Sequence, residues 1–218
     1  MHKNKASEQI GRSMVEMLGV LAVVAVLTVS AIAGYSKVLY KFRADKAMED
    51  LSALAADIEA KFSHIGTYTG LTSKVAYNTG LFGPDLTKNC NSESDVADIG
   101  TSSSEETSGN EKVVVSTVNS IGTTCVISIL NGSGIAVSAN SDGKSFVIAV
   151  DKIFRNSCAT FASQDWGNGS GFNSLTITPE SGAPVKILRN MSASEMIQAG
   201  INCGNCIEGK CIAVWTFN

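Results

Sequence analysis

The residues with the most evident chemistry are six cysteines, and all of them lie beyond residue 89. They are Cys90, Cys125, Cys158, Cys203, Cys206 and Cys211. An even number of cysteines in a region rich in Gly, Ser and Thr is typical of a disulfide framework formed in an oxidising compartment. One alternative is a set of free thiols. Another is a zinc site, since Cys203-x2-Cys206-x4-Cys211 has ligand-like spacing, but structural zinc needs a fourth ligand and no second paired knuckle exists.

Catalytic and phosphate-binding patterns are weakly supported. The chain has two histidines, His2 and His64, which is too few for a convincing Ser–His–Asp or Cys–His set. Gly143-Lys144-Ser145 ends like a phosphate-binding loop, but Ser138 stands where that motif needs its first glycine. A net charge of −3 gives no sign of nucleic-acid binding. We therefore expect neither an enzyme nor a cofactor or metal site.

Glu16 is the acidic residue in the most unusual surroundings. It stands at the start of an uncharged stretch, Met17–Ser36, whose sequence is MLGVLAVVAVLTVSAIAGYS. A carboxylate at the centre of a bilayer costs about 2.5 to 3.5 kcal/mol on insertion scales, and less near a helix end. Either Glu16 lies at the level of the lipid headgroups, or it has a positively charged partner.

The uncharged stretch itself predicts a membrane-spanning helix. Its 20 residues, at about 1.5 Å each, give about 30 Å, which matches the hydrocarbon core of a bilayer. A secretory signal peptide has a shorter apolar region that ends at a small-residue cleavage site. A buried core helix rarely stays apolar on every face for this length. Membrane insertion is therefore the favoured interpretation.

The residues around Glu16 resemble the processing site of type IV prepilins. The stretch from Gly11 to Val20 reads GRSMVEMLGV. The resemblance implies a leader, residues 1–11, that a prepilin peptidase cleaves after Gly11, so that Arg12 becomes the new N-terminus and Glu16 the fifth residue. Two features depart from the family: Arg12 is basic where the family usually has an apolar residue, and the helix lacks the proline that often kinks it. The first leaves N-methylation of Arg12 open.

The resemblance also implies how subunits assemble. Cleavage exposes an α-amino group with a reference pKa of about 8, which is mostly cationic at neutral pH. In a filament core of packed apolar helices, an unpaired carboxylate is costly. Glu16 facing the Arg12 amine of a neighbouring subunit removes that cost and fixes the axial register. Basic residues flank the span on both sides, so the positive-inside rule does not set its orientation, and the cysteines place the C-terminal part outside.

The function that this resemblance implies is that of a structural subunit, a type IVb-like major pilin. It starts as an inner-membrane precursor and polymerises with itself into an extracellular pilus, with the prepilin peptidase and the pilus assembly machinery as partners. The alternatives are a minor pilin, a pseudopilin of type II secretion, or a membrane-anchored periplasmic binding protein or enzyme. What the head binds, whether in adhesion, aggregation, DNA uptake or conjugation, stays open.

One long helix is expected to connect the two parts of the molecule. An apolar face continues beyond the uncharged stretch at steps of three and four, formed by Leu51, Leu54, Ala55, Ile58, Phe62 and Ile65. We expect a helix from about Ser13 to His64, ended by Gly66. The resulting organisation is a leader at 1–11, a helix at 12–65 with 14–36 in the membrane or filament core, and a globular head at 66–218.

Alternating and β-branched segments predict a mainly antiparallel sheet in the head. The expected strands are 112–118, 124–130, 134–139, 145–150, 172–178, 185–188 and 211–217, with an Asp142-Gly143 hairpin turn. Short helices are expected at 151–164 and, opened by the capping box Ser192-Ala-Ser-Glu195, at 192–199. The run Gly100–Gly109 reads as a solvated loop. The predicted fold class is therefore α+β, a long helix packed on a pilin-like sheet with small helices and disulfides.

Sequence alone does not choose among the cysteine pairings. We expect Cys158 to pair with Cys203 or Cys206, because closing that long loop constrains the unfolded chain by about 4 kcal/mol. A Cys203–Cys206 ring is short and strained, so Cys211 takes whichever of the two is left. Cys90 with Cys125 is then the remaining pair.

Overall fold

The computed structural model describes residues 6–108, 111–128, 130, 132–164, 166 and 171–218, with the backbone alone at 6–13, 33, 36, 37, 108 and 111. The chain forms two compact units, Met1–Phe42 and Arg43–Asn218. The first helix is α1 (Ala6–Phe62). The other elements are α2 (Ser73–Asn78), α3 (Pro84–Thr87), η1 (Glu93–Asp95), β1 (Ser102–Ser108), β2 (Glu111–Thr117), β3 (Ile135–Ala139), β4 (Phe146–Ile153), α4 (Arg155–Ala162), β5 (Phe172–Thr178), β6 (Val185–Leu188), α5 (Ala193–Asn202), η2 (Cys203–Asn205) and β7 (Cys211–Phe217).

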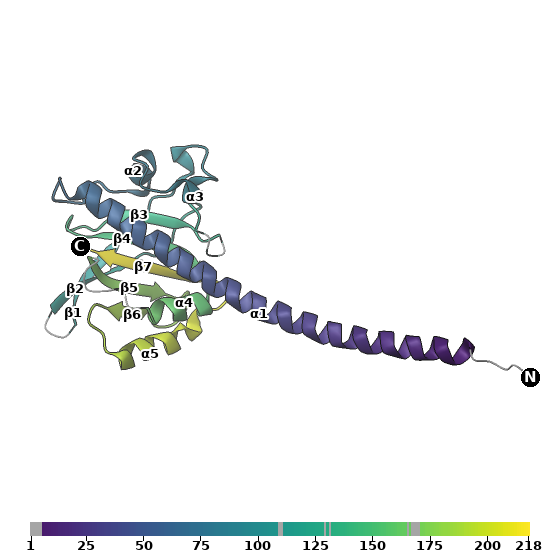
Figure 1. Cartoon of the computed structure of the whole chain (residues 1–218). Coiled ribbons are helices and arrows are strands. Elements are labelled where there is room, and N and C mark those ends of the chain that lie inside the picture. Colours follow the sequence, from purple (N-terminus) through teal and green to yellow (C-terminus); the bar gives the residue numbers. More distant parts are fainter. Residues whose placement is uncertain (1–5, 109–110, 129, 131, 165, 167–170) are drawn as a thin grey trace, which may run out of the picture. The chain divides into compact units, whose positions relative to one another are not determined.

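The part of α1 that begins at Arg43 lies across the sheet of the C-terminal unit (Figure 1). Its buried side chains share one core with the strands and recur every three or four residues, as one face of a helix requires: Ala44, Ala47, Leu51, Leu54, Ala55 and Ile58. The boundary between the two compact units therefore falls within the helix, after Phe42. The predicted apolar face ends early, since Ile65 is exposed.

The helix ends at Phe62 because Gly66 takes a left-handed conformation, with φ of 72°, and its N–H donates to the carbonyl of Phe62 at 3.1 Å. This is two residues before the predicted end at His64. At the other end, helical backbone begins at Ala6 and not at Ser13.

The main sheet has five antiparallel strands in the order β3-β4-β7-β5-β6. The last strand of the chain, β7, is the central one, paired through Trp215 with Ile148 of β4 and with Leu175 of β5. The predictions for β5, β6, β7 and the β3–β4 hairpin are confirmed, and the combination of apolar helix, antiparallel sheet, small helices and disulfides is α+β.

The two faces of this sheet are covered differently. One face packs on α1 and carries most of the core, including the aromatic contact of Phe161 with Trp215. The other face packs a smaller apolar cluster with Val118 and Ile121, which follow β2. β2 itself lies against β5, where Ser174 Oγ donates to the carbonyl of Val114 at 2.8 Å. β2 pairs with β1 as a separate two-stranded sheet. The prediction of a loop at 100–109 was therefore wrong over Ser102–Ser108, because β2 offers this polar segment a strand partner; Gly109 lies outside the described residues.

Two further predictions need correction. The described residues of 124–130 form no strand beyond a single bridge of Ile127 with Gly134, because the N–H groups of Ile127 and Cys125 donate to helical segments instead: to Leu86 O in α3 and to Asp95 O in η1, each at 3.0 Å. The helix expected at 151–164 begins only at Arg155, because β4 continues through a bulge to Ile153.

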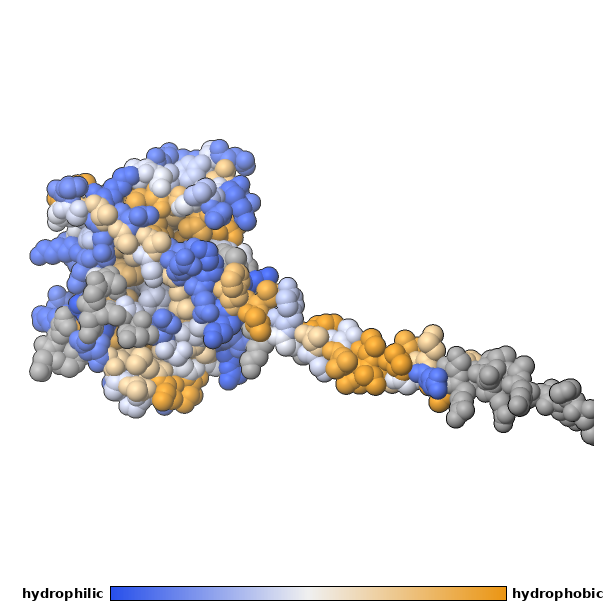
Figure 2. Space-filling model, in the orientation of Figure 1, coloured by the Kyte–Doolittle hydropathy of each residue, from blue (hydrophilic) through white to orange (hydrophobic). Residues whose placement is uncertain are grey.

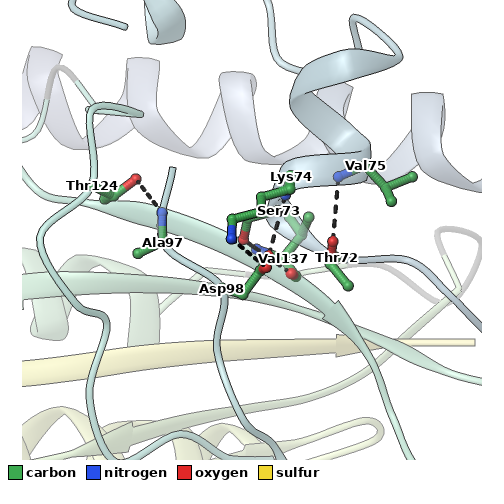
Figure 3. Close-up of polar contacts among 8 residues, drawn as sticks. All are labelled: Thr72, Ser73, Lys74, Val75, Ala97, Asp98, Thr124 and Val137. Carbon is green, nitrogen blue, oxygen red and sulfur yellow. Dashed lines mark hydrogen bonds and ion pairs between the residues drawn. The ribbon is translucent and has the colours of Figure 1, made fainter. Parts of the chain in front are cut away.

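The outer edge of β3 is protected by Thr72 and by the first residue of α2, Ser73 (Figure 3). Ser73 is buried, and its hydroxyl both donates to the carbonyl of Val137 at 3.1 Å and accepts from the N–H of Val137 at 3.0 Å. Thr72 caps α2, and Asp98 accepts from the N–H of Lys74 at 3.2 Å. The two bonds of Ser73 occupy the N–H and C=O of Val137 that an open edge would offer to another chain.

Candidate membrane-inserting and assembly segment

The N-terminal unit contains a helix that is long and apolar enough to cross a membrane. Its apolar segment is Met14–Ile32, with a mean hydropathy of 2.4, and none of it is buried within the chain. Figure 2 shows these apolar side chains gathered along the helix. A surface of this kind is stable only when lipid or other apolar helices cover it, because each exposed Leu, Val or Ile carries a hydration cost.

The hydroxyl groups in the apolar segment are satisfied within the helix. Thr28 Oγ1 donates to the carbonyl of Val24 at 2.7 Å, and Ser30 Oγ donates to the carbonyl of Val26 at 2.9 Å. Each therefore needs no partner outside its own helix, which lowers the cost of placing a polar atom in an apolar medium. The backbone of this segment is helical throughout, so its N–H and C=O groups are paired as well.

Glu16 differs from these hydroxyl groups because its carboxylate forms no hydrogen bond or ion pair with the side chains and backbone that the structure describes. It is exposed, and it lies at the N-terminal end of the apolar segment with Val15 and Met17 exposed on either side. Gly11 and Arg12, the residues of the expected cleavage site, are in helical backbone, and their side chains lie outside the described part. Along a helix, Arg12 and Glu16 are four residues apart, about 6 Å in axial rise.

The cysteines form three disulfides, all within the C-terminal unit: Cys90–Cys125, Cys158–Cys203 and Cys206–Cys211. Of the two partners left open for Cys158, the structure has Cys203. This bond joins α4 to the end of α5, and Cys206–Cys211 fastens the start of β7. All six sulfurs are used, so none is available as the thiolate that zinc would need.

The other residues singled out in the sequence have structural surroundings. His64 is exposed just after α1. Gly143 has φ of 62° in the β3–β4 hairpin turn, and Asp142 Oδ1 accepts from the N–H groups of Lys144 and Ser145 at 2.9 and 3.1 Å. These contacts are those of an Asx-type turn, not of a phosphate cradle.

Sequence reasoning missed a small pocket beside the bulge in β4. It has a volume of about 260 Å³, and Asp151, Lys152, Thr123 and Thr124 are among its lining residues. Asp151 Oδ1 accepts from the N–H of Gly134 at 2.6 Å, yet burial raises the pKa of this carboxyl, and the Gly134 bond and the charge of Lys152 only partly oppose that effect. Its lining residues supply one carboxylate and no nucleophile–base pair. The alternation of apolar and polar residues along this strand gave no indication of the bulge, so the pocket beside it was not predicted.

A second carboxyl with a raised pKa is that of Glu59, on α1. Among the described residues its Oε1 is buried without a hydrogen-bond partner, and burial raises its pKa above the ordinary value of 4.5. Its charge contributes to the raised pKa of Tyr68, after burial of that phenol. Gly171, whose φ is 66°, lies beside Oε1; its left-handed backbone favours glycine, and a Cβ there would also displace the Glu59 carboxyl.

We expect Glu59→Gln to stabilise the C-terminal unit slightly at neutral pH, by at most about 0.5 kcal/mol, because it removes a poorly solvated charge and keeps the shape, while solvent screens much of the effect at a partly exposed side chain. A folded-state pKa above the unfolded one means that stability falls as the pH rises through that interval. The gain should therefore disappear below about pH 4.5. Urea unfolding, followed by tryptophan fluorescence at several pH values from about 4 to about 8, measures the difference in the free energy of unfolding between the variant and the unaltered chain.

The matched control is Asp57→Asn, which removes one charge from an exposed position of the same helix. Its unfolding should keep the pH dependence of the unaltered chain. If Glu59→Gln lowered stability at neutral pH, the carboxylate would have to be engaged by a favourable partner.

Two comparisons with known proteins give no match. No protein-family model matches the chain, and no curated protein matches it at a significant level. The functional argument therefore depends on the residues and their geometry.

Proposed function

We propose that this chain is the structural subunit of a type IV pilus, a pilin, whose apolar N-terminal helices pack in the filament core. The observation that carries the proposal is the exposed apolar segment Met14–Ile32 with a single carboxylate, Glu16, at its N-terminal end. A helix that serves only as a lipid anchor does not require that carboxylate. In a polymer, the carboxylate can form an ion pair with a cationic amine of the next subunit.

The arrangement of the second unit supports the same proposal. Its core, disulfides and sheet all lie beyond Arg43, so it has its own hydrophobic core and does not depend on the apolar segment for burial. A subunit that moves from a membrane into a filament needs such a unit, because the surroundings of its apolar helix change. The covered β3 edge limits unspecific strand pairing between crowded heads.

Electron microscopy of cells that express the chain tests the proposal directly. We expect filaments that an antibody against residues of the C-terminal unit labels along their whole length. Labelling at a few points would make the chain a minor pilin. Cells in which the protein is abundant, processed and membrane-bound but forms no labelled filaments would favour a pseudopilin or an anchored periplasmic protein instead.

Processing provides a second, independent test. We expect a prepilin peptidase to cut between Gly11 and Arg12, so that Gly11→Val leaves the full-length precursor in the membrane. N-terminal sequencing of the mature subunit checks the site, with Gly19→Val as the matched control, since no side chain lies within 4 Å of that position. A mature chain that starts elsewhere than Arg12 contradicts the assignment.

A further inference from the structure

The residues that follow the apolar stretch form a distinct surface, here called the interfacial segment, Tyr35–Phe42. The exposed fractions of its large side chains are 65% for Tyr35, 67% for Val38, 49% for Tyr40 and 58% for Phe42. Three of the 14 aromatic residues of the chain therefore stand exposed on two turns of helix. Within the C-terminal unit, by contrast, most described aromatic rings pack against one another.

The position of the interfacial segment matches the headgroup layer of a bilayer. The 20 uncharged residues of Met17–Ser36 extend over about 30 Å, the thickness of the hydrocarbon core. The next six residues, 37–42, add about 9 Å, close to the 5–8 Å of one headgroup layer. Tyrosine is enriched at this depth in membrane proteins because its ring is apolar and its hydroxyl is polar.

The positive charge of the interfacial segment favours anionic lipids. Lys37 and Lys41 are its charged residues, and between Glu16 and Asp45 the sequence has no acidic residue. Lys41 is exposed, and within the described part of the chain it forms no ion pair or hydrogen bond. Lys46 in the next unit, by contrast, is engaged by Asp50 at 2.9 Å and by Glu49 at 3.4 Å. An exposed ammonium in a positively charged segment attracts an anion.

We propose that the interfacial segment binds anionic phospholipid headgroups in the leaflet at the C-terminal end of the apolar helix, with Lys41 contacting a lipid phosphate and Tyr40 at the level of the glycerol backbone. The interaction holds the subunit at a fixed depth before assembly. The inference rests on the membrane insertion in the proposed function. A second copy of the chain, which would offer carboxylates to Lys41, is the competing occupant.

A tryptophan at position 40 measures this contact. The full chain with Tyr40→Trp is reconstituted in vesicles of equal phosphatidylglycerol and phosphatidylcholine, with one of the two lipids brominated near the headgroup end of its acyl chains. We expect stronger quenching of the new tryptophan by brominated phosphatidylglycerol than by brominated phosphatidylcholine. Adding Lys41→Gln should lower this preference by about fivefold, the factor that one basic residue contributes at an anionic surface.

The matched control is Lys88→Gln, which removes an exposed lysine from the C-terminal unit and should leave the preference unchanged. Equal quenching by the two lipids, or an unchanged preference with Lys41→Gln, overturns the inference while the inserted helix stands. Quenching that is lost as protein is added, together with cross-linking between Lys41 and a second copy, overturns it in favour of the competing occupant. No quenching by either lipid contradicts membrane insertion and therefore the proposed function itself.

Discussion

Cells that carry Glu16→Ala should assemble few or no filaments, while the subunit is still cleaved, inserted and disulfide-bonded. In the proposed pilus, Glu16 faces the α-amino group of Arg12 from an adjacent subunit. Removing the carboxylate leaves a cationic amine unpaired in an apolar core, a cost on the order of 3 to 5 kcal/mol for each subunit. Glu16→Gln keeps the shape and loses the charge, so it should fail as well. Counting filaments by electron microscopy, beside immunoblots of the membrane fraction, gives the measurement.

The control is Ser30→Ala, which removes a polar atom from the same apolar segment. Its hydroxyl bonds only to the carbonyl of Val26 in its own helix, so its loss should not affect contacts between subunits. Non-reducing gels should show the same disulfides in all three variants, because Glu16 and the cysteines lie in different units. Pili in normal number from Glu16→Ala cells would refute electrostatic docking and leave Glu16 as a tolerated residue at headgroup level.

Loss of the Cys158–Cys203 disulfide should produce the largest change in stability. The bond closes a separation of 45 residues, and the chain-entropy model assigns it about 4 kcal/mol. Both cysteines are fully buried against α4 and α5, so their replacement also loses core packing. We expect Cys158→Ala/Cys203→Ala to lower the free energy of unfolding by at least this amount. Urea unfolding of the full chain in mild detergent measures it, since both tryptophans, Trp166 and Trp215, lie in the C-terminal unit.

The double variant Cys206→Ala/Cys211→Ala is the matched control. It removes a disulfide with equally buried sulfurs that closes a separation of only 5 residues, for which the same model gives about 2 kcal/mol. Equal losses in the two variants would mean that packing around the sulfurs, not loop closure, sets the effect. A smaller loss for the longer loop would contradict the entropic account.

Much of the C-terminal unit could be predicted because its local signals were strong. Phe172–Thr178, Val185–Leu188 and Cys211–Phe217 are apolar, β-branched segments bounded by turn residues, and the strands have these bounds. The capping box at Ser192 fixed the start of α5, since Ser192 and Glu195 bond to each other's backbone. Such features depend on neighbours within a few residues, which the sequence shows.

Segments that depend on distant partners were predicted less well. Thr124–Leu130 has the composition of a strand, but the N–H groups of Ile127 and Cys125 donate to Leu86 in α3 and to Asp95 in η1, and Cys125 is bonded to Cys90. Ser102–Ser108 has the composition of a loop, but β2 lies beside it and supplies a full ladder. In both cases the available backbone partner outweighed the local preference.

The candidate assembly site shows the same division. The apolar segment, the place of Glu16 at its start and the lone charge there are properties of spacing, so the sequence by itself determined them. The pairing of Cys158 with Cys203, the central position of β7, and the buried Oε1 of Glu59 were decided only by the tertiary structure. The physical reason is that each of these depends on which distant segments share one core, and the hydrophobic effect that brings them together is non-directional until side chains pack.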